Sequence, residues 1–393
     1  MKQAVILAAG EGQRLRPFTV NKPKVMISIA GKPVLQYVVE ALVKGGIHYI
    51  VIVVGYRREQ IFDYFGNGER FDANIVYITQ ERQLGTAHAL AQVKDAVESE
   101  FLVLPGDNLI EVNTIASFIN VKPTTVLVKK IINPIRYGVV NTEGDFVKEV
   151  IEKPEDASKD ISTVNTGIYA FNSGIFNFIN DNLGIPDVIN NMIGQNYTVS
   201  AQETDGTWLD IVYPWDILEL NDIVLPWLPS DLGGTIETGA FIKGKVLVGK
   251  NTVIRSNSYI RGPVVIGENC DIGPNIHIMP ATSIGNNVVI SAFSEIKNSV
   301  ISDDVSIEAN SIVQDSVIDK GCVIKGHFSA CSDQTEIKVN DEYYSVNVGT
   351  MLGVGCWLGN NVVAQPGAIV GNYSRINSMK LISGRLPDKS IVM

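Results

Sequence analysis

A six-residue period is the feature that most constrains the fold of this 393-residue chain. From residue 236 an aliphatic side chain recurs at every sixth position, eleven times without a miss: Ile236, Ile242, Val248, Ile254, Ile260, Ile266, Ile272, Ile278, Ile284, Ile290 and Ile296. The frame slips by one residue at Ile301 and again at Ile318, and it resumes at Val346. Hexapeptide repeats build a parallel β-helix, in which short strands turn corners and every sixth side chain points inward. With three hexapeptides per coil, the pattern predicts roughly seven coils.

The repeats also set the domain limits that we expect in the second half of the chain. We place the β-helix at residues 236–378, with a loop insertion at about 327–345, where the register breaks, and a C-terminal tail at 379–393. An ordinary β-sandwich would instead show side-chain alternation with period two and irregular loops. The six-residue period therefore favours the β-helix.

The first half of the chain has a different pattern. Buried strands are expected at 4–7, 50–54, 75–78, 101–104 and 125–128, and helices at 34–44, 58–65 and 86–96. Strands that alternate with helices predict an α/β domain with a Rossmann-like, mostly parallel sheet covered on both faces. We place this domain at residues 1–228 and a linker rich in Pro and Gly at 229–235.

Charge and hydropathy exclude several classes of protein. The formal net charge of −10 argues against a general nucleic-acid binder, which would carry a basic surplus. Apolar runs such as 50–54 are too short to span a bilayer, so no membrane partner is expected. The apolar N-terminus is too short for a signal peptide and is followed at once by charged residues, which predicts a cytoplasmic protein. The four cysteines show no CxxC spacing, so we expect reduced, mostly packed thiols.

A glycine-containing segment follows the first expected strand. Gly10 and Gly12 would let backbone N–H groups approach a phosphate closely. Four cations lie within fifteen residues of Gly10, which suits a polyanion better than a simple charged loop: Arg14, Arg16, Lys22 and Lys24. The segment is not a Walker A loop, because no Lys-Ser/Thr pair follows, and Leu15 occupies the third glycine position of a dinucleotide fingerprint.

Residues 7–19, 22–24 and 31–33 together resemble the signature of the sugar-1-phosphate nucleotidylyltransferases. The family includes glucose-1-phosphate thymidylyltransferases and uridylyltransferases and the bifunctional N-acetylglucosamine-1-phosphate uridylyltransferases. The resemblance implies transfer of a nucleotidyl group from a nucleoside triphosphate to a sugar 1-phosphate, with release of pyrophosphate. It also implies that the β-helix is left-handed.

The resemblance assigns roles residue by residue. Catalytic roles fall on Arg14, Lys24 and Asp107. Nucleotide binding falls on Leu7, Ala9, Gly10, Gly12, Arg14, Gln80, Gly85, Thr86 and Asp107. Sugar-phosphate binding falls on Gly138, Glu152, Lys153 and Asn165. The metal, Mg²⁺, would be held by Asp107 and Asp210.

The chemistry of the two aspartates agrees with these roles. Asp107 follows the expected strand at 101–104, and ligands of open α/β sheets bind at the carboxyl ends of strands. Magnesium prefers one or two carboxylates together with phosphate oxygens. The motifs leave the substrates open, because residues 83–86 resemble the hexosamine branch whereas 137–140, 152–154 and 208–210 resemble the glucose branch. We therefore expect UTP or dTTP, and glucose 1-phosphate or N-acetylglucosamine 1-phosphate.

A second activity in the β-helix is the alternative hypothesis. Bifunctional relatives of this architecture carry an acetyl-CoA-dependent N-acetyltransferase, whose general base is a histidine in the irregular loop. We place that position at Ser332, beside Asp333, and a serine hydroxyl cannot abstract a proton near pH 7. His327 lies five residues away. The favoured hypothesis is a scaffold that forms a homo-oligomer, a trimer or a multiple of it.

Overall fold

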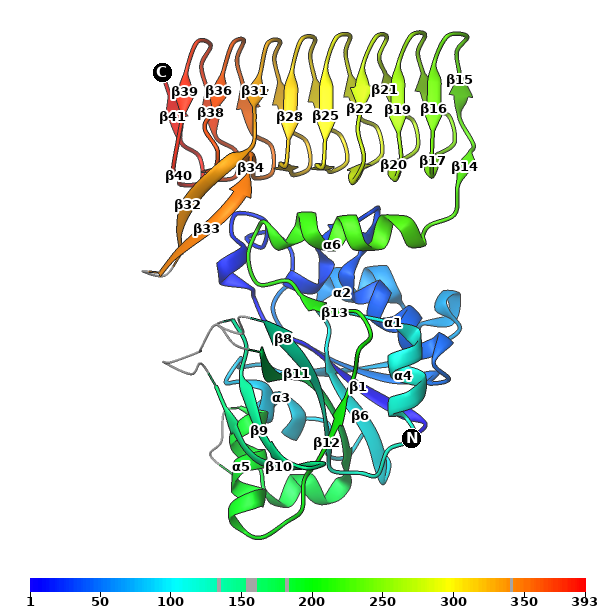
Figure 1. The fold of residues 1–393 in the computed structure, drawn as a ribbon, viewed down its shortest axis with the longest axis vertical. Coiled ribbons are helices and arrows are strands. Elements are labelled where there is room, and N and C mark those ends of the chain that lie inside the picture. The colour runs from blue at the N-terminus through cyan, green and yellow to red at the C-terminus, as the bar shows by residue number, and fades with distance from the viewer. Residues whose placement is uncertain (133–135, 153–160, 181–183, 340–341) are drawn as a thin grey trace. The chain divides into compact units, whose positions relative to one another are not determined.

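The computed structural model describes residues 1–393 except 133–135, 153–160, 181–183 and 340–341 (Figure 1). The chain forms two compact units. The first contains residues 1–11, 22–26 and 34–210, and the second contains 12–21, 27–33 and 211–393. Residues 12–21, which include Arg14, therefore group with the C-terminal half of the chain.

The first unit is built on a nine-stranded mixed sheet of order β5-β4-β1-β6-β11-β8-β12-β10-β9 (Figure 1). Its strands are β1 (Gln3–Ala8), β4 (Tyr49–Val54), β5 (Asn74–Thr79), β6 (Glu100–Pro105), β8 (Thr125–Ile132), β9 (Val139–Glu143), β10 (Phe146–Ile151), β11 (Ile161–Asn172) and β12 (Ser200–Glu203). The block β5-β4-β1-β6 is parallel, whereas β11 joins both β6 and β8 antiparallel. The mixed sheet is confirmed: the four-stranded parallel block ends where β11 enters, and beyond β11, among the described residues, only β8 and β12 pair parallel.

Helices accompany this sheet; the first three lie at the expected positions, and the last two were not predicted. They are α1 (Val34–Lys44), α2 (Glu59–Phe65), α3 (Thr86–Ala91), α4 (Val112–Phe118) and α5 (Ile185–Gly194), with short 3₁₀ turns η2 (Lys24–Met26), η3 (Glu69–Phe71) and η4 (Ser173–Asn177). The helix predicted at 86–96 ends as an α-helix at Ala91. On β1, Ile6 belongs to one apolar core and the adjacent Val5 to another, so the sheet is buried on both faces.

The second unit is a parallel β-helix of three sheets (Figure 1). The first sheet contains β14 (Asp231–Leu232), β17 (Val246–Val248), β20 (Val264–Ile266), β23 (Thr282–Ile284), β26 (Val300–Ile301), β29 (Val317–Ile318), β34 (Thr350–Leu352), β37 (Ala368–Val370) and β40 (Arg385–Leu386). The second contains β15 (Thr235–Ile236), β18 (Val253–Ile254), β21 (Asp271–Ile272), β24 (Val289–Ile290), β27 (Ser306–Ile307), β30 (Val323–Ile324), β35 (Trp357–Leu358), β38 (Arg375–Ile376) and β41 (Ile391–Val392). The third contains β16 (Phe241–Lys243), β19 (Tyr259–Arg261), β22 (His277–Ile278), β25 (Glu295–Lys297), β28 (Ile312–Gln314), β31 (Ser329–Ala330), β36 (Val363–Ala364) and β39 (Leu381–Ile382).

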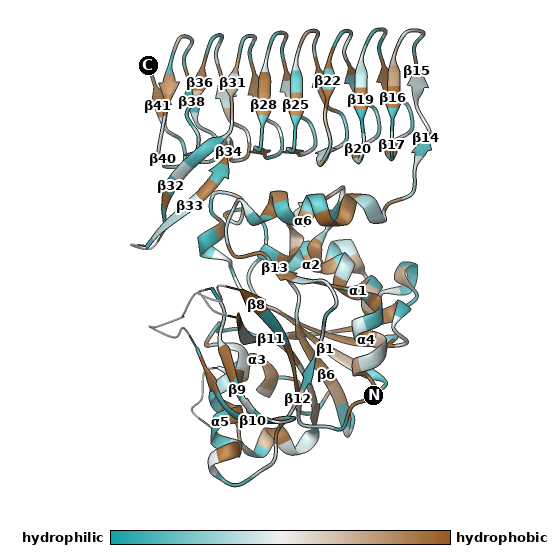
Figure 2. Ribbon diagram, viewed as in Figure 1, coloured by the Kyte–Doolittle hydropathy of each residue, from teal (hydrophilic) through white to brown (hydrophobic). Residues whose placement is uncertain are grey.

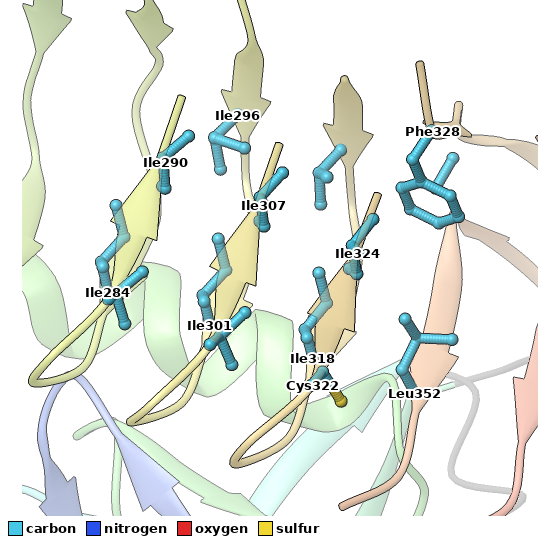
Figure 3. Close-up of a cluster of buried hydrophobic side chains, with 14 of the residues drawn as sticks. Ile284, Ile290, Ile296, Ile301, Ile307, Ile318, Cys322, Ile324, Phe328 and Leu352 are labelled. Atoms are coloured by element: carbon cyan, nitrogen blue, oxygen red, sulfur yellow. The ribbon is translucent and has the colours of Figure 1, made fainter. Parts of the chain in front are cut away.

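The six-residue period is the inward face of these strands. Ile284, Ile301 and Ile318 occupy paired positions in successive coils, side by side in Figure 3, and belong to one buried core. Each slip of the frame corresponds to a coil that is one residue shorter, and the strand pairing continues across it. Several corners carry asparagine in the left-handed region, such as Asn251 and Asn269 with φ of 60° and 56°. Asparagine tolerates this conformation better than other side chains with a Cβ. The predicted left-handed parallel β-helix is confirmed.

The β-helix extends further than the predicted limits. β14 lies in the predicted linker, and β39, β40 and β41 lie in the predicted tail, where Ile382 is buried in the same core. The three sheets have nine, nine and eight strands, so the estimate of about seven coils was too low. Ile382 continues the six-residue period after Ile376, but the spacing falls to four residues before Leu386, which interrupts the pattern.

The predicted loop insertion at about 327–345 begins too early, because β31 (Ser329–Ala330) is a strand of the β-helix, and the rest of its described residues belong mainly to a hairpin. β32 (Asp333–Val339) pairs antiparallel with β33 (Glu342–Val348). Val346 pairs with Thr335 in this hairpin, so its assignment as an inward β-helix position was wrong. The period matched there by coincidence, because a β-strand of the hairpin also alternates apolar and polar residues.

The remaining elements of the second unit are short. They are η1 (Gln13–Leu15), β2 (Ser28–Ile29), β3 (Lys32–Pro33), α6 (Asp216–Val224) and η5 (Leu225–Trp227). The buried Asn221 of α6 donates to the Ala281 carbonyl of the β-helix and accepts from the Ala30 N–H. Figure 2 shows the apolar residues of the α6 helix alternating with polar ones.

Candidate active site

A tight turn at Gly106 and Asp107 follows the buried strand β6. The Gly106 N–H donates to the Leu7 carbonyl of β1 at 3.0 Å. A Cβ at Gly106 would lie 3.1 Å from side-chain carbons of both Ile6 and Val25, so only glycine fits without displacing the core. The turn is thereby fixed at the carboxyl ends of two parallel strands, the usual ligand-binding edge of such sheets.

Lys24 and Asp107 form an ion pair at this edge. Their side chains are only 21% and 16% exposed. Lys24 begins the turn η2, so the neighbouring buried Val25 anchors it to the core. The sequence predicted from two separate motifs that Lys24 and Asp107 share a catalytic site, and the two side chains are in contact.

Asp210 reaches the same region through a two-stranded ladder. β13 (Trp208–Asp210) pairs antiparallel with β7 (Asn108–Ile110), and the register sets Asp210 opposite Asn108, the residue after Asp107. The carbonyl of Thr166 accepts from both the Asn108 amide and the Trp208 indole N–H, at 3.0 and 3.1 Å. These buried bonds tie β7, which follows Asp107, and β13, which ends at Asp210, to the same carbonyl.

The two aspartates fit a divalent cation by their donor chemistry. In the described residues, no group of three or more His, Cys, Asp or Glu side chains could hold a metal ion. Two carboxylates leave most of an octahedral shell to water and phosphate oxygens, which is the arrangement that Mg²⁺ prefers.

The segments predicted to bind the sugar phosphate also converge. The Asn165 N–H donates to the Gly138 carbonyl at 2.8 Å. A Cβ at Gly138 would lie 3.8 Å from the Cα of Glu152. The Asn165 amide donates to the buried Tyr169 hydroxyl, and burial raises the pKa of Tyr169, so this hydroxyl stays neutral. Lys153 lies outside the described residues.

Gln80 and His88 organise the segment predicted to contact the base. The buried Gln80 amide nitrogen donates to the Gly85 carbonyl at 3.1 Å and lies 2.9 Å from Nδ1 of His88. The Thr86 hydroxyl accepts from the Ile185 N–H at 3.0 Å. Both amide donors of Gln80 therefore serve the protein, and its Oε1 is the atom suited to a ligand.

Residues 12–21 form a compact turn within the second unit. Gly12 has φ of 76°, and its carbonyl accepts from the Leu15 N–H and the Thr19 hydroxyl. Leu15 and Thr19 are fully buried, whereas Arg14 is exposed. The turn therefore presents Arg14 outward from an anchored backbone.

Sequence reasoning missed the residues that support this site. Asn108, Thr166 and His88 are polar groups that bond site segments together, and none of these contacts was predicted. For Asn108 and Thr166 the signal in the sequence was a polar residue in an apolar strand, which requires a buried partner.

The chain belongs to the nucleotidyl transferase family, because the family model described as "Nucleotidyl transferase" matches residues 3–225. The expected enzyme class is therefore confirmed. A second model, described as the "GMPPB C-terminal domain", matches residues 260–344. No helix in the described part of the chain is both long and apolar enough to cross a membrane.

Relatives resemble the chain over nearly its whole length. The bifunctional protein GlmU of Methanococcus maripaludis is 33% identical, over 99% of this chain and 96% of its own. A bifunctional sugar-1-phosphate nucleotidylyltransferase/acetyltransferase of Sulfurisphaera tokodaii is 33% identical, over 95% of each chain. A crystal structure of a Bacillus anthracis protein assigned as a glucose-1-phosphate thymidylyltransferase, bound to sucrose, is 28% identical with a TM-score of 0.51, over 56% of this chain and 94% of its own.

Proposed function

We propose that the chain transfers a nucleotidyl group from UTP or dTTP to glucose 1-phosphate or N-acetylglucosamine 1-phosphate, with Mg²⁺, giving an NDP-sugar and pyrophosphate. The observation that carries this proposal is the Lys24–Asp107 pair at the carboxyl ends of β1 and β6. Asp210 lies close by in the chain pairing, because it is paired with Asn108, the residue after Asp107. The names of the full-length relatives support the same reaction.

Asp107 and Asp210 would hold the Mg²⁺. The ion would neutralise phosphate charge and orient the phosphate oxygens. Lys24 would contribute a second positive charge beside the reacting phosphates, released from Asp107 as substrate binds. The sugar phosphate oxygen would attack the α-phosphorus in line, a reaction that needs positioning and charge neutralisation more than a general base.

The nucleotide would lie along the first strand and its loop. Leu7, Ala9, Gly10 and Gly12 would offer backbone groups, and Arg14 would bind the triphosphate. Gln80, Gly85 and Thr86 would contact the base. Because the amide nitrogen Nε2 of Gln80 already bonds Gly85 and His88, its Oε1 would accept from the ligand, which suits the N3–H of uracil or thymine. Cytosine presents an acceptor at N3.

The sugar phosphate would bind where Gly138, Glu152 and Asn165 converge, with Lys153 on its phosphate. Glu152 would accept hydrogen bonds from sugar hydroxyls, since a carboxylate offers only acceptors. The exposed Glu152 side chain is accessible for this contact.

Pyrophosphate release tests the proposal. Five nucleoside triphosphates (UTP, dTTP, CTP, ATP, GTP) are combined with glucose 1-phosphate, N-acetylglucosamine 1-phosphate and glucosamine 1-phosphate, with Mg²⁺ or EDTA. We expect metal-dependent release with UTP or dTTP and one of the first two sugars. Absence of release in every well would overturn the proposal, and preference for CTP would overturn the role of Gln80.

Acetyl transfer is the second candidate function, favoured by the bifunctional names of relatives that span the whole chain. Against it, Ser332 stands where a histidine is expected, and the Asp333 carboxylate accepts from the Gln334 N–H. His327 is exposed at a β-helix corner. Acetyl-CoA with glucosamine 1-phosphate tests this activity, and loss of acetyl transfer in His327→Ala or Asp333→Asn would establish it.

One face of the β-helix suits a homo-oligomer, which we propose to be a trimer or a multiple of it. The outward positions of the third sheet form a continuous ladder: Phe241, Tyr259, His277, Glu295, Ile312, Ser329, Val363 and Leu381. Four of these positions are exposed large hydrophobic residues, with Phe241 and Leu381 56% and 62% exposed, and exposed apolar patches are commonly covered by a partner. Light scattering should show a trimer that Ile312→Asp dissociates, whereas Val289→Asp on the second sheet should not.

A further inference from the structure

The turn that carries Arg14 is bonded to the last coils of the β-helix. The Asn372 amide donates to the Pro17 carbonyl at 3.1 Å, in a buried setting. Arg385 donates through Nη2 to the Arg16 carbonyl at 2.9 Å. Two consecutive carbonyls of the turn therefore accept from side chains that lie more than 350 residues later in the chain.

Asn372 is itself held rigidly. It is 1% exposed, its Oδ1 accepts from the Val354 N–H, and its amide also donates to the Asp388 carboxylate. These bonds join three successive stretches of the β-helix and fix the amide that points at Pro17. A Cβ at Gly353 would lie 3.0 Å from the Cβ of Pro17, so the coil approaches the turn closely.

The bonds from Asn372 and Arg385 add to those within the turn, where the Gly12 carbonyl accepts from the Leu15 N–H and the Thr19 hydroxyl. Gly12 is in the left-handed region, and only three consecutive residues form the 3₁₀ turn η1. A turn that samples several conformations binds its ligand more weakly, because the apparent affinity falls with the fraction of molecules in the competent state. Side chains that fix its backbone therefore raise the affinity for whatever Arg14 binds.

We propose that Asn372 and Arg385 are positioning residues for the nucleoside triphosphate: they hold residues 12–21 so that Arg14 is presented to the polyphosphate. This inference rests on the proposed role of Arg14 in nucleotidyl transfer. It makes the C-terminal coils a working part of nucleotide binding, in addition to any scaffold or acetyltransferase role.

Arg385→Ala tests the proposal in the full-length chain. It removes one bond to the turn and leaves the Asn372 network in place. We expect the KM for the triphosphate to rise about three- to tenfold, as expected for one lost hydrogen bond, with kcat and the KM for the sugar phosphate little changed. Arg385→Lys, which keeps a donor, should recover part of the loss.

Arg375→Ala is the matched control. Arg375 lies on β38 and stacks over the Trp357 ring at 4.6 Å, so the variant removes an arginine from a nearby strand without touching the turn. Hydrogen–deuterium exchange of the nucleotide-free chain gives a readout that does not depend on activity. Exchange at the Leu15 and Phe18 amides, which bond within the turn, should accelerate in Arg385→Ala and stay unchanged in Arg375→Ala.

These measurements distinguish failure of the positioning proposal from failure of the proposed function. Unchanged exchange and an unchanged KM in Arg385→Ala would overturn the proposal, and so would a lower melting temperature alone. An equal rise in KM in Arg375→Ala would also overturn it. If the wild-type chain released no pyrophosphate while Arg385→Ala still loosened the turn, the proposed function would fail and the anchoring would stand, with the role in triphosphate binding overturned.

Discussion

The Lys24 ammonium and the Asp107 carboxylate form an ion pair in which each side chain is mostly shielded from solvent. The pair joins the turn η2 to the turn after β6. A substrate phosphate and a cation would each have to take over one member of the pair. Both residues are thus held in place before the substrate arrives, which lowers the cost of organising the site.

Asp107→Asn should lower kcat by about 100-fold or more, the scale of losing one preorganised electrostatic group. The amide keeps the shape of the carboxylate and removes its charge. Pyrophosphate release measures the effect, and circular dichroism checks the fold. The exposed Asp95→Asn is the control, and wild-type turnover in Asp107→Asn would contradict the assignment.

Gly106→Ala should destabilise the chain by about 1–3 kcal/mol, because the added methyl contacts Ile6, Val25 and Leu35. The displaced turn should also carry Asp107 away from Lys24 and reduce kcat. Gly194→Ala, at the end of α5 with open space around its Cβ, should leave stability and turnover unchanged or slightly improved. Equal effects in the two variants would show that Gly106 is not a packing requirement.

His88→Ala should raise the KM for the triphosphate about three- to tenfold, because Gln80 loses one of the two acceptors that fix its amide. The KM for the sugar phosphate should stay constant. His48→Ala removes an exposed histidine that contacts the Asp72 carbonyl and serves as the control. An unchanged KM for the triphosphate in His88→Ala would show that Gln80 is fixed by Gly85 alone.

Ile290→Ala should cost about 2–5 kcal/mol of unfolding free energy, since Ile290 is fully buried in the β-helix core (Figure 3). Val289→Ala on the same strand should change it by less than about 0.5 kcal/mol, because Val289 faces outward and is 42% exposed. Equilibrium denaturation measures the unfolding free energy of both variants. Similar losses in the two would contradict the inward register of β24.

Thiol labelling of the native chain should modify the exposed Cys331 and leave the three buried cysteines unmodified. Cys331 is exposed, whereas Cys270, Cys322 and Cys356 are buried, and all four are free thiols. A disulfide-exchange reagent should label one thiol in the native chain and four after denaturation. Cys331→Ser should abolish native labelling, and labelling of a second site would show that the β-helix opens on the timescale of the assay.

The sequence predicted the β-helix because its information is local and repeated. Each inward isoleucine reports the same constraint, so eleven regular positions outweigh any single exception. The last coils were missed because the spacing falls from six residues to four between Ile382 and Leu386. The hairpin strands were missed because a period of two and a period of six coincide at Val346.

The site was predictable where one motif carries the chemistry, as at Lys24 and Asp107. Contacts between distant segments carried no such signal. The sequence around Asn372 and Arg385 does not indicate that each donates to a backbone carbonyl of the N-terminal turn. Every residue has a backbone carbonyl, so the type of the accepting residue does not identify it as a hydrogen-bond partner. The limits of the predicted domains failed for the same reason, since residues 12–21 belong with the C-terminal half.

The bond between Arg385 and the Arg16 carbonyl spans 369 residues of sequence. During synthesis, the turn leaves the ribosome first and its partners leave last. A chain cut short by premature termination or by a protease would retain every motif of the nucleotide site and still lack the supports of its arginine turn. On the proposed role of Arg385, a chain cut before this residue would therefore bind the triphosphate more weakly than one that retains it.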